Sequence, residues 1–157
     1  MATNDKIVLG IDPGTQIMGY GLICINNNQT SLVTLGVIEL KKYPEHFDRL
    51  QHIFERVDML IKEFKPQELA IEAPFFGKNV QSMLKLGRAQ GIAMAAALSH
   101  HLVVYEYSPR KIKQSLTGNG NASKEQVAAM LQKILKFDEL PRFLDATDAL
   151  AVAVCHS

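Results

Sequence analysis

One stretch near the start of the chain, from Lys6 to Leu22, constrains the fold more than any other. It reads KIVLGIDPGTQIMGYGL: an apolar run from Ile7 to Ile11 ends in the acid Asp12, and Pro13-Gly14 breaks the run at once. A continuous apolar run bounded by turn residues is typical of a buried central strand. A second apolar stretch, Ile17 to Ile25, follows so closely that the two suggest a hairpin, although short apolar runs do not by themselves separate strand from helix.

The rest of the chain alternates between strand patterns and helix patterns. Strands are predicted at 31–41, 68–72 and 101–105, and helices at 44–64, from 79 or 82 to 97, at 110–115, at 123–136 and after Pro141. A meander followed by β-α-β crossovers predicts an α/β fold, a mixed five-stranded sheet with helices on both faces. At 157 residues we expect one domain over 1–157.

Two of the predicted strands end in an acid, Asp12 and Glu72. Ligand sites in open α/β sheets gather at strand ends where the topology reverses. If these two strands are neighbours, their carboxylates lie close enough to repel each other, and one would take up a proton. A hard divalent cation removes the repulsion, and Mg²⁺ suits carboxylate oxygens. Two such ions about 3.5–4 Å apart can activate the attacking water and stabilise the leaving oxygen of a phosphodiester.

Two further acids, Asp145 and Asp148, are three residues apart and so share one face of the predicted last helix. An alternative is that Asp145 is an N-cap and Asp148 a first-turn acid favoured by the helix dipole. However, Leu140-Pro141-Arg142 offers an earlier helix start, and three alanines, Ala146, Ala149 and Ala153, keep the helix slender, as close packing against a sheet edge would require. We interpret the four acids as one metal-binding catalytic site.

Composition limits the classes of protein that remain. Hydrophobic residues make up 47% and charged residues 21%, which is enough for a full core. No apolar stretch approaches the ~20 residues of a membrane span, and the N-terminus has no signal-peptide pattern. Cys24 and Cys155 have no metal-ligand spacing, so a reducing cytoplasm is expected. The net charge is only +1, but residues 78–136 hold 9 basic and 2 acidic residues, which indicates a basic patch that grips phosphates, or else an unevenly charged solvated surface.

Several residues near the predicted acids are candidates for binding DNA. Phe75 and Phe76 follow the Glu72 strand and can stack on an unpaired base, although aromatic residues are more often core. Lys78 and Asn79 continue the same loop, and Lys113 and Lys124 flank the Gly118-Gly120 loop. The alternative for both of these lysines is ordinary surface. Of the five histidines, only His156 lies near the acidic helix, and we expect it to be a surface or terminal residue.

An ordered set of motifs resembles the RuvC family of bacterial Holliday-junction resolvases. The motifs, covering nearly the whole chain in order, are Gly10-Ile11-Asp12-Pro13-Gly14-Thr15, Gly19-Tyr20-Gly21, Ile71-Glu72, Lys78-Asn79, Leu84 to Gly91, Ser108 to Gln114, Gly118-Asn119-Gly120 with Lys124, and Asp145 to Ala151. Each motif alone is weak, but the ordered set is specific.

The resemblance implies an RNase H-like fold, a homodimer, and Mg²⁺-dependent nicking of two opposed strands of a four-way DNA junction. There would be two Mg²⁺ ions per site, and Mn²⁺ would be able to substitute. The family's metal-binding catalytic acids correspond to Asp12, Glu72, Asp145 and Asp148, and its base-stacking aromatic corresponds to Phe75. Lys113 and Lys124 match basic residues that hold DNA near the cut. The family's partners are the branch-migration proteins RuvA and RuvB.

Two departures from the family pattern stand out. Ala73-Pro74 is not the commonest sequence after this glutamate in the family, so Phe76 could be the stacking residue instead of Phe75. Many relatives also carry a further basic tail after the position of Ser157. Two alternative functions occur in proteins of the same fold family. An actin-like ATP-handling protein would need a second domain to close over nucleotide, and an RNase H-like DNA-binding protein without nuclease activity would not need Glu72, Asp145 and Asp148 together.

Overall fold

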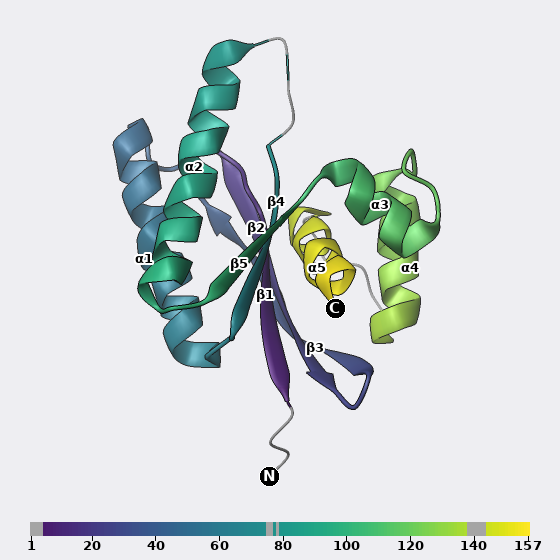
Figure 1. The fold of residues 1–157 in the computed structure, drawn as a ribbon. Coiled ribbons are helices and arrows are strands. Elements are labelled where there is room, and N and C mark those ends of the chain that lie inside the picture. Colours follow the sequence, from purple (N-terminus) through teal and green to yellow (C-terminus); the bar gives the residue numbers. More distant parts are fainter. Residues whose placement is uncertain (1–4, 75–76, 78, 138–143) are drawn as a thin grey trace.

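The computed structural model describes residues 5–74, 77, 79–137 and 144–157 (Figure 1). Within these residues the elements follow in the order β1 (Lys6–Asp12), β2 (Ile17–Asn26), β3 (Gln29–Glu39), α1 (His46–Phe64), β4 (Glu68–Glu72), α2 (Val80–Ser99), β5 (Val103–Tyr107), α3 (Pro109–Thr117), α4 (Lys124–Leu135) and α5 (Leu144–His156). The predicted order of strands and helices, including the β1–β2 hairpin, is confirmed.

The strands form one mixed sheet in the order β3-β2-β1-β4-β5. β1 is antiparallel to β2, with Asp12 opposite Gly19, and parallel to β4, with Ile11 opposite Ile71. β5 continues the sheet parallel to β4. Because β1 and β4 are parallel neighbours in this register, Asp12 and Glu72 end adjacent strands at the same edge of the sheet.

Helices cover both faces of the sheet, as predicted: α1 and α2 lie on one side and α3, α4 and α5 on the other (Figure 1). Side chains alternate between the faces of a strand. Leu9 and Ile11 of β1 therefore join the core beneath α1 and α2, whereas Val8 joins the core beneath α5. The same alternation places Asp12 and Glu72 on the α5 face.

Helix α5 packs directly across the central strands rather than against a sheet edge, which corrects one detail of the sequence-based prediction. It contacts β2 and β1 more than any other strands. A side chain at Gly10 would collide with the carbonyl oxygen of Ala149, and one at Gly19 would collide with that of Asp145. Glycine in these strands allows the close approach of the helix backbone. The predicted slender alanine face of the helix is what meets the sheet.

β3 and β5 begin and end two residues away from the predicted 31–41 and 101–105, and left-handed turn residues explain where each strand begins. Asn27 and Asn28 have φ values of 50° and 66°, and this tight turn lets β3 pair from Gln29, two residues earlier than expected. His101 has a φ of 63°, and the backbone N–H of Leu102 still bonds to the carbonyl of Ala97 in α2. The turn after α2 is therefore bonded to the helix end as far as Leu102, and β5 begins at Val103 instead of His101.

Candidate active site

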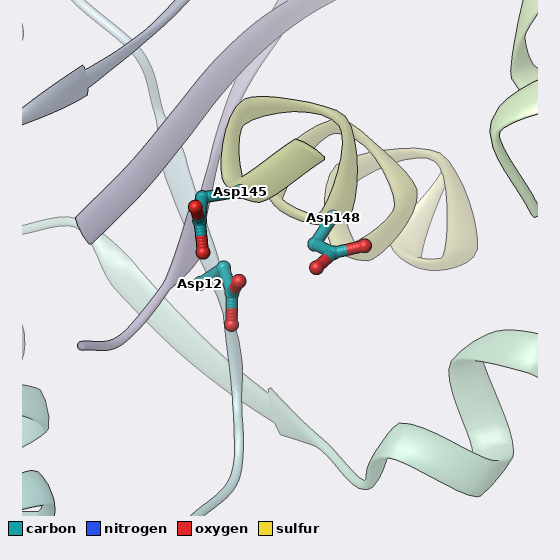
Figure 2. Close-up of side chains that lie close together, drawn as sticks. All are labelled: Asp12, Asp145 and Asp148. Carbon is teal, nitrogen blue, oxygen red and sulfur yellow. The ribbon is translucent and has the colours of Figure 1, made fainter. Parts of the chain in front are cut away.

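Three aspartates converge where β1 meets α5. Asp12 ends β1, and Asp145 and Asp148 lie in the first turns of α5 (Figure 2). One carboxylate oxygen from each lies within 4.8 Å of the others, an arrangement that can hold a metal ion. Because α5 already includes Leu144, Asp145 lies inside the helix rather than at its cap. Asp145 and Asp148 therefore share one face of α5, as their spacing predicts.

The fourth predicted acid, Glu72, approaches Asp12 from the neighbouring strand. It lines the same cleft, and its side chain hydrogen-bonds to that of Asp12. The group of three within 4.8 Å does not include Glu72, so its carboxyl stands beside that group. Backbone bonds fix the end of β4, because the N–H of Ala73 donates to the carbonyl of Tyr107 at 2.8 Å.

Without a cation, the carboxylates of this site repel one another. Burial, the hydrogen bond to Glu72 and the charges of Glu72, Asp148 and Asp145 together raise the pKa of Asp12 to about 10. Burial also raises the pKa of Asp148, although Lys124 acts in the opposite direction. Buried carboxylates with like-charged neighbours are destabilised in the ionised form. Oxygen-only donors in this state fit a hard divalent cation, which would supply the missing positive charge.

The acids line a cleft of about 470 Å³ whose other lining residues are two lysines and a set of apolar side chains. Lys113 from α3 and Lys124 from the start of α4 both reach this cleft. The Lys124 ammonium lies 3.0 Å from a carboxylate oxygen of Asp148, and this hydrogen bond raises the pKa of Lys124. The two lysines that the sequence places on either side of the Gly118-Gly120 loop thus lie beside the acids.

The loop after Glu72 is described only in part. The predicted contacts Phe75, Phe76 and Lys78 lie outside the described residues. Asn79 is described as the N-cap of α2, and its side-chain oxygen accepts a hydrogen bond from the backbone N–H of Ser82 at 3.1 Å. This capping role matches one of the two helix starts that the sequence offered.

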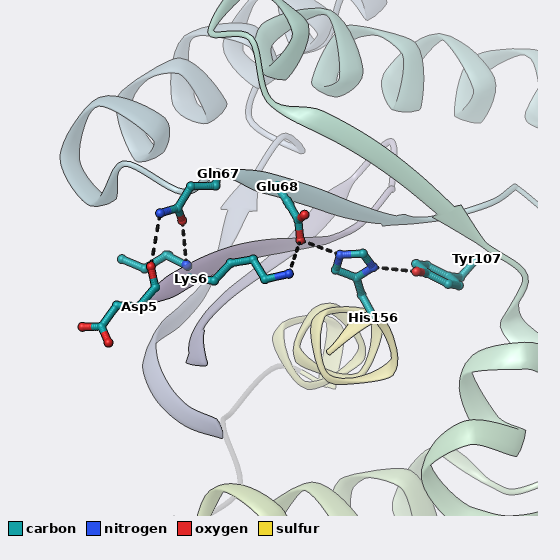
Figure 3. Close-up of polar contacts among 7 residues, drawn as sticks. Asp5, Lys6, Gln67, Glu68, Tyr107 and His156 are labelled. Carbon is teal, nitrogen blue, oxygen red and sulfur yellow. Dashed lines mark hydrogen bonds and ion pairs between the residues drawn. The ribbon is translucent and has the colours of Figure 1, made fainter. Parts of the chain in front are cut away.

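The expectation that His156 is a surface residue is wrong. Its side chain is only 10% exposed and lies between two partners (Figure 3). Nδ1 is 2.6 Å from the hydroxyl of Tyr107, and Nε2 is 2.8 Å from the carboxylate of Glu68, which also pairs with Lys6 at 3.2 Å. Although burial raises the pKa of Glu68, its contacts with His156 and Lys6 bring that pKa below its usual value. The contacts tie the end of α5 to β4 and β5, and so help to place the aspartates at its start.

A second positioning residue that the sequence did not reveal is Gln90. It is buried among the alanines of α2, and its amide nitrogen donates to the carbonyl oxygen of Glu72 at 3.3 Å and to the carboxylate of Glu106. A glutamine inside the most apolar helix of the chain was the available signal, since a buried polar group needs partners. For His156 the signal was its spacing of eight residues from Asp148, which puts both on one side of α5.

Comparison with known proteins gives consistent matches. A family model described as crossover junction endodeoxyribonuclease RuvC matches residues 8–156. The chain is 66% identical over 154 residues to the crossover junction endodeoxyribonuclease RuvC of Cytophaga hutchinsonii, covering 98% of this chain and 77% of that protein. It is 59% identical to the protein of the same name from Bacteroides fragilis over 154 residues, covering 97% and 82%.

Among solved structures, Thermus thermophilus RuvC in complex with Holliday junction substrate matches with a TM-score of 0.89 and 34% identity, covering 96% of this chain and 92% of that chain. The yeast mitochondrial Holliday junction resolvase Ydc2 shares the fold, with a TM-score of 0.70, 16% identity, and coverage of 94% and 76%. The predicted RNase H-like fold is confirmed by these neighbours. Among the described helices, none has the length and apolar character needed to cross a membrane.

Proposed function

The chain belongs to the RuvC family of crossover junction endodeoxyribonucleases, and from that premise we propose that it resolves Holliday junctions by nicking two opposed strands of a four-way DNA junction. One observation carries the proposal: three aspartates from β1 and α5 meet beside Glu72 in a cleft that two lysines also line. This arrangement supports phosphodiester hydrolysis over the two rivals, DNA binding without cleavage and ATP handling.

We assign Asp12, Glu72, Asp145 and Asp148 as the catalytic acids that would hold Mg²⁺, two ions per site, with Mn²⁺ as a substitute. A bound pair of ions would activate a water for attack on phosphorus and stabilise the leaving oxygen. The chain's own contribution is to gather the oxygens. β1 and β4 present Asp12 and Glu72, and α5 presents the other two from the opposite side. The raised pKa of Asp12 supports this assignment, because the cluster has an excess of negative charge to offset.

Lys113 and Lys124 are proposed to hold the DNA backbone next to the acids. Both line the cleft from helices that flank the Gly118 turn. Lysine acts on phosphate as a flexible point charge, so these contacts give affinity without reading sequence. Phe75 or Phe76 is proposed to stack on an unpaired base, and Lys78 and Asn79 to contact DNA from the same loop. These four assignments rest on the sequence and on the family.

Paired nicks need two active sites, and we propose that the protein acts as a homodimer through α2. Large apolar side chains lie exposed along this helix: Val80 is 64% exposed, Leu84 57% and Leu98 58%. Gly87 and Gly91 lie four residues apart, and among the described residues a Cβ at either would meet nothing within 4 Å beyond its chain neighbours and the nearby backbone of α2. A face of this kind suits close packing against a second copy of the helix. We further propose that the chain forms a single domain, that the protein is cytoplasmic, and that RuvA and RuvB are its partners.

The experiment compares cleavage of a four-way junction with cleavage of a linear duplex of the same arm sequence. With Mg²⁺ the protein should cut the junction symmetrically and leave the duplex intact, and a chelator should stop the reaction. Equal cutting of both DNAs would contradict junction resolution. Junction binding that is never followed by cleavage, with either Mg²⁺ or Mn²⁺, would favour the rival reading of a DNA-binding protein without nuclease activity.

A further inference from the structure

A second cavity lies across the β1–β2 turn from the acidic cleft. It measures about 500 Å³, and the lining residues that matter here are Thr15, His46, Arg49, Ser82, Lys85 and Leu86. Leu86 lines both cavities, and Pro13 in the acidic cleft precedes Thr15 in the second by two residues. The two cavities are therefore neighbours on the same surface, separated by the turn that follows Asp12.

The second cavity is basic where the first is acidic. Arg49 and Lys85 line it, and none of its lining residues is acidic. Burial, with the positive charges of Arg88, Lys85 and Arg49, lowers the pKa of His46, which shows that these cations gather around one imidazole. Within the described part of the chain, none of the three has an ion-pair partner. Like charges gathered in this way attract a counter-anion.

Two details of the cavity would suit an anion held in a defined position. The Nε2 atom of His46 is buried and has no hydrogen-bond partner among the described residues, although buried polar atoms are normally paired. The Arg49 guanidinium is already oriented, because Nε donates to the carbonyl of Tyr43 at 2.6 Å and Nη1 donates to that of Thr15 at 3.0 Å. Arg49 thereby joins the cavity wall to the turn beside Asp12.

We propose that the cavity formed by His46, Arg49 and Lys85 binds a phosphodiester of the DNA strand that is being cut, next to the one held at the acids. Phosphate oxygens would accept from the His46 ring and pair with Lys85, and Arg49, which bonds to the turn from α1, would supply further positive charge. A strand gripped on both sides of this turn is fixed in register, so that one scissile phosphate faces Asp12. This inference rests on the proposed function and deepens it.

The first test uses Lys85→Gln, because Lys85 is exposed and its loss should leave the fold intact. Affinity for linear duplex and for the junction is measured across a salt series in chelator, where no cutting occurs. The absolute slope of log affinity against log salt should fall by about one unit on both DNAs, as for one lost phosphate contact. Lys133→Gln is the matched control, since Lys133 is exposed at the end of α4 away from Lys124. It should leave the slope unchanged.

The second test follows the ring nitrogens of His46 by NMR while wild-type protein is saturated with duplex. The Nε2 signal should move on binding, and the movement should be smaller in Lys85→Gln. An unchanged salt slope in Lys85→Gln, or a His46 signal that does not respond to DNA, would overturn the phosphate site. Neither readout needs cleavage or junction preference. Failure of the proposed function would instead appear as absent cutting with both readouts intact.

Discussion

Lys124 and Asp148 form an ion pair with 3.0 Å between the ammonium nitrogen and a carboxylate oxygen, which joins the first residue of α4 to the acidic face of α5. The pair lies in the cleft with the other acids, so the lysine that we propose to hold a phosphate is bound to an acid. Its partner is already present before DNA arrives. DNA or a metal ion would therefore compete with an existing contact rather than meet a free charge.

Replacing Lys124 with alanine should weaken binding to every junction sequence by a similar factor. Each phosphate neutralised on duplex arms contributes about −0.9 to the slope of log affinity against log salt, so the variant should lose roughly one unit of slope. Lys133→Ala provides the control for removing a lysine from the same helix. A Lys124→Ala protein with the wild-type slope would mean that this lysine is occupied by Asp148 alone.

Phe75→Ala should behave differently from the lysine variant. A base-stacking aromatic is worth ~1–3 kcal/mol and carries no charge, so its loss should depress single-turnover cleavage more than binding and leave the salt slope unchanged. Phe76→Ala is the companion variant, and the larger defect identifies which of the two stacks. A core phenylalanine would instead lower stability by ~3–5 kcal/mol, and a large drop in melting temperature would contradict stacking.

The acidic cluster should make the metal-free protein less stable as the pH rises. An acid whose pKa is higher in the folded state keeps its proton while the unfolded chain loses it, so stability falls between the two pKa values. For Asp12 these are the ordinary 3.8 and about 10. At pH 8 in chelator, Asp12→Asn should therefore melt above wild type, with each kcal/mol worth about 2–4 °C. Mg²⁺ should raise the wild-type melting temperature more than that of the variant. Equal melting temperatures of wild type and Asp12→Asn in chelator would contradict the electrostatic repulsion within the acidic cluster.

The exposed face of α2 predicts a defined change in assembly. Leu84→Arg places a charge where two copies of the helix would pack, and Leu84 is exposed enough for the monomer to keep its fold. Light scattering at micromolar concentration should give a dimer for wild type and a monomer for the variant. Leu84→Met, which preserves the apolar surface, should remain a dimer. A wild-type monomer under these conditions would contradict the proposed interface.

Much of the site followed from sequence because its geometry is local or follows from strand order. The order of strands and helices allowed β1 and β4 to be neighbours, and their parallel pairing brings Asp12 and Glu72 together. Asp145 and Asp148 are separated by nearly one helical turn, so their spacing alone placed them on one face. The contacts of His156 escaped prediction because Glu68 and Tyr107 lie far from it in the chain, 88 and 49 residues away. Which partner a polar group finds across such separations depends on packing, and a single sequence does not record it.

The cavity formed by His46, Arg49 and Lys85 was not predicted from the sequence for the same reason. His46 and Arg49 begin one helix and Lys85 belongs to another, and only the packing of α1 on α2 brings them beside Thr15. Arg49 lies outside residues 78–136, where the basic residues concentrate in the sequence, although in the folded protein it lines the same cavity as Lys85. Charge patterns along a sequence thus predicted a basic surface without predicting that it continues past the acids onto α1.

Single-turnover cleavage of a four-way junction by Asp12→Asn and Glu72→Gln, measured beside junction binding in chelator, tests the metal-dependent site most directly. Both amides preserve side-chain volume and remove the charge that would hold Mg²⁺. Cleavage should fall by at least about 100-fold while binding, which depends on lysines and shape, stays near wild type. The melting temperature of each variant separates lost chemistry from lost fold. If either variant cuts the junction at a rate near that of wild type, the acids are not the metal-binding catalytic centre.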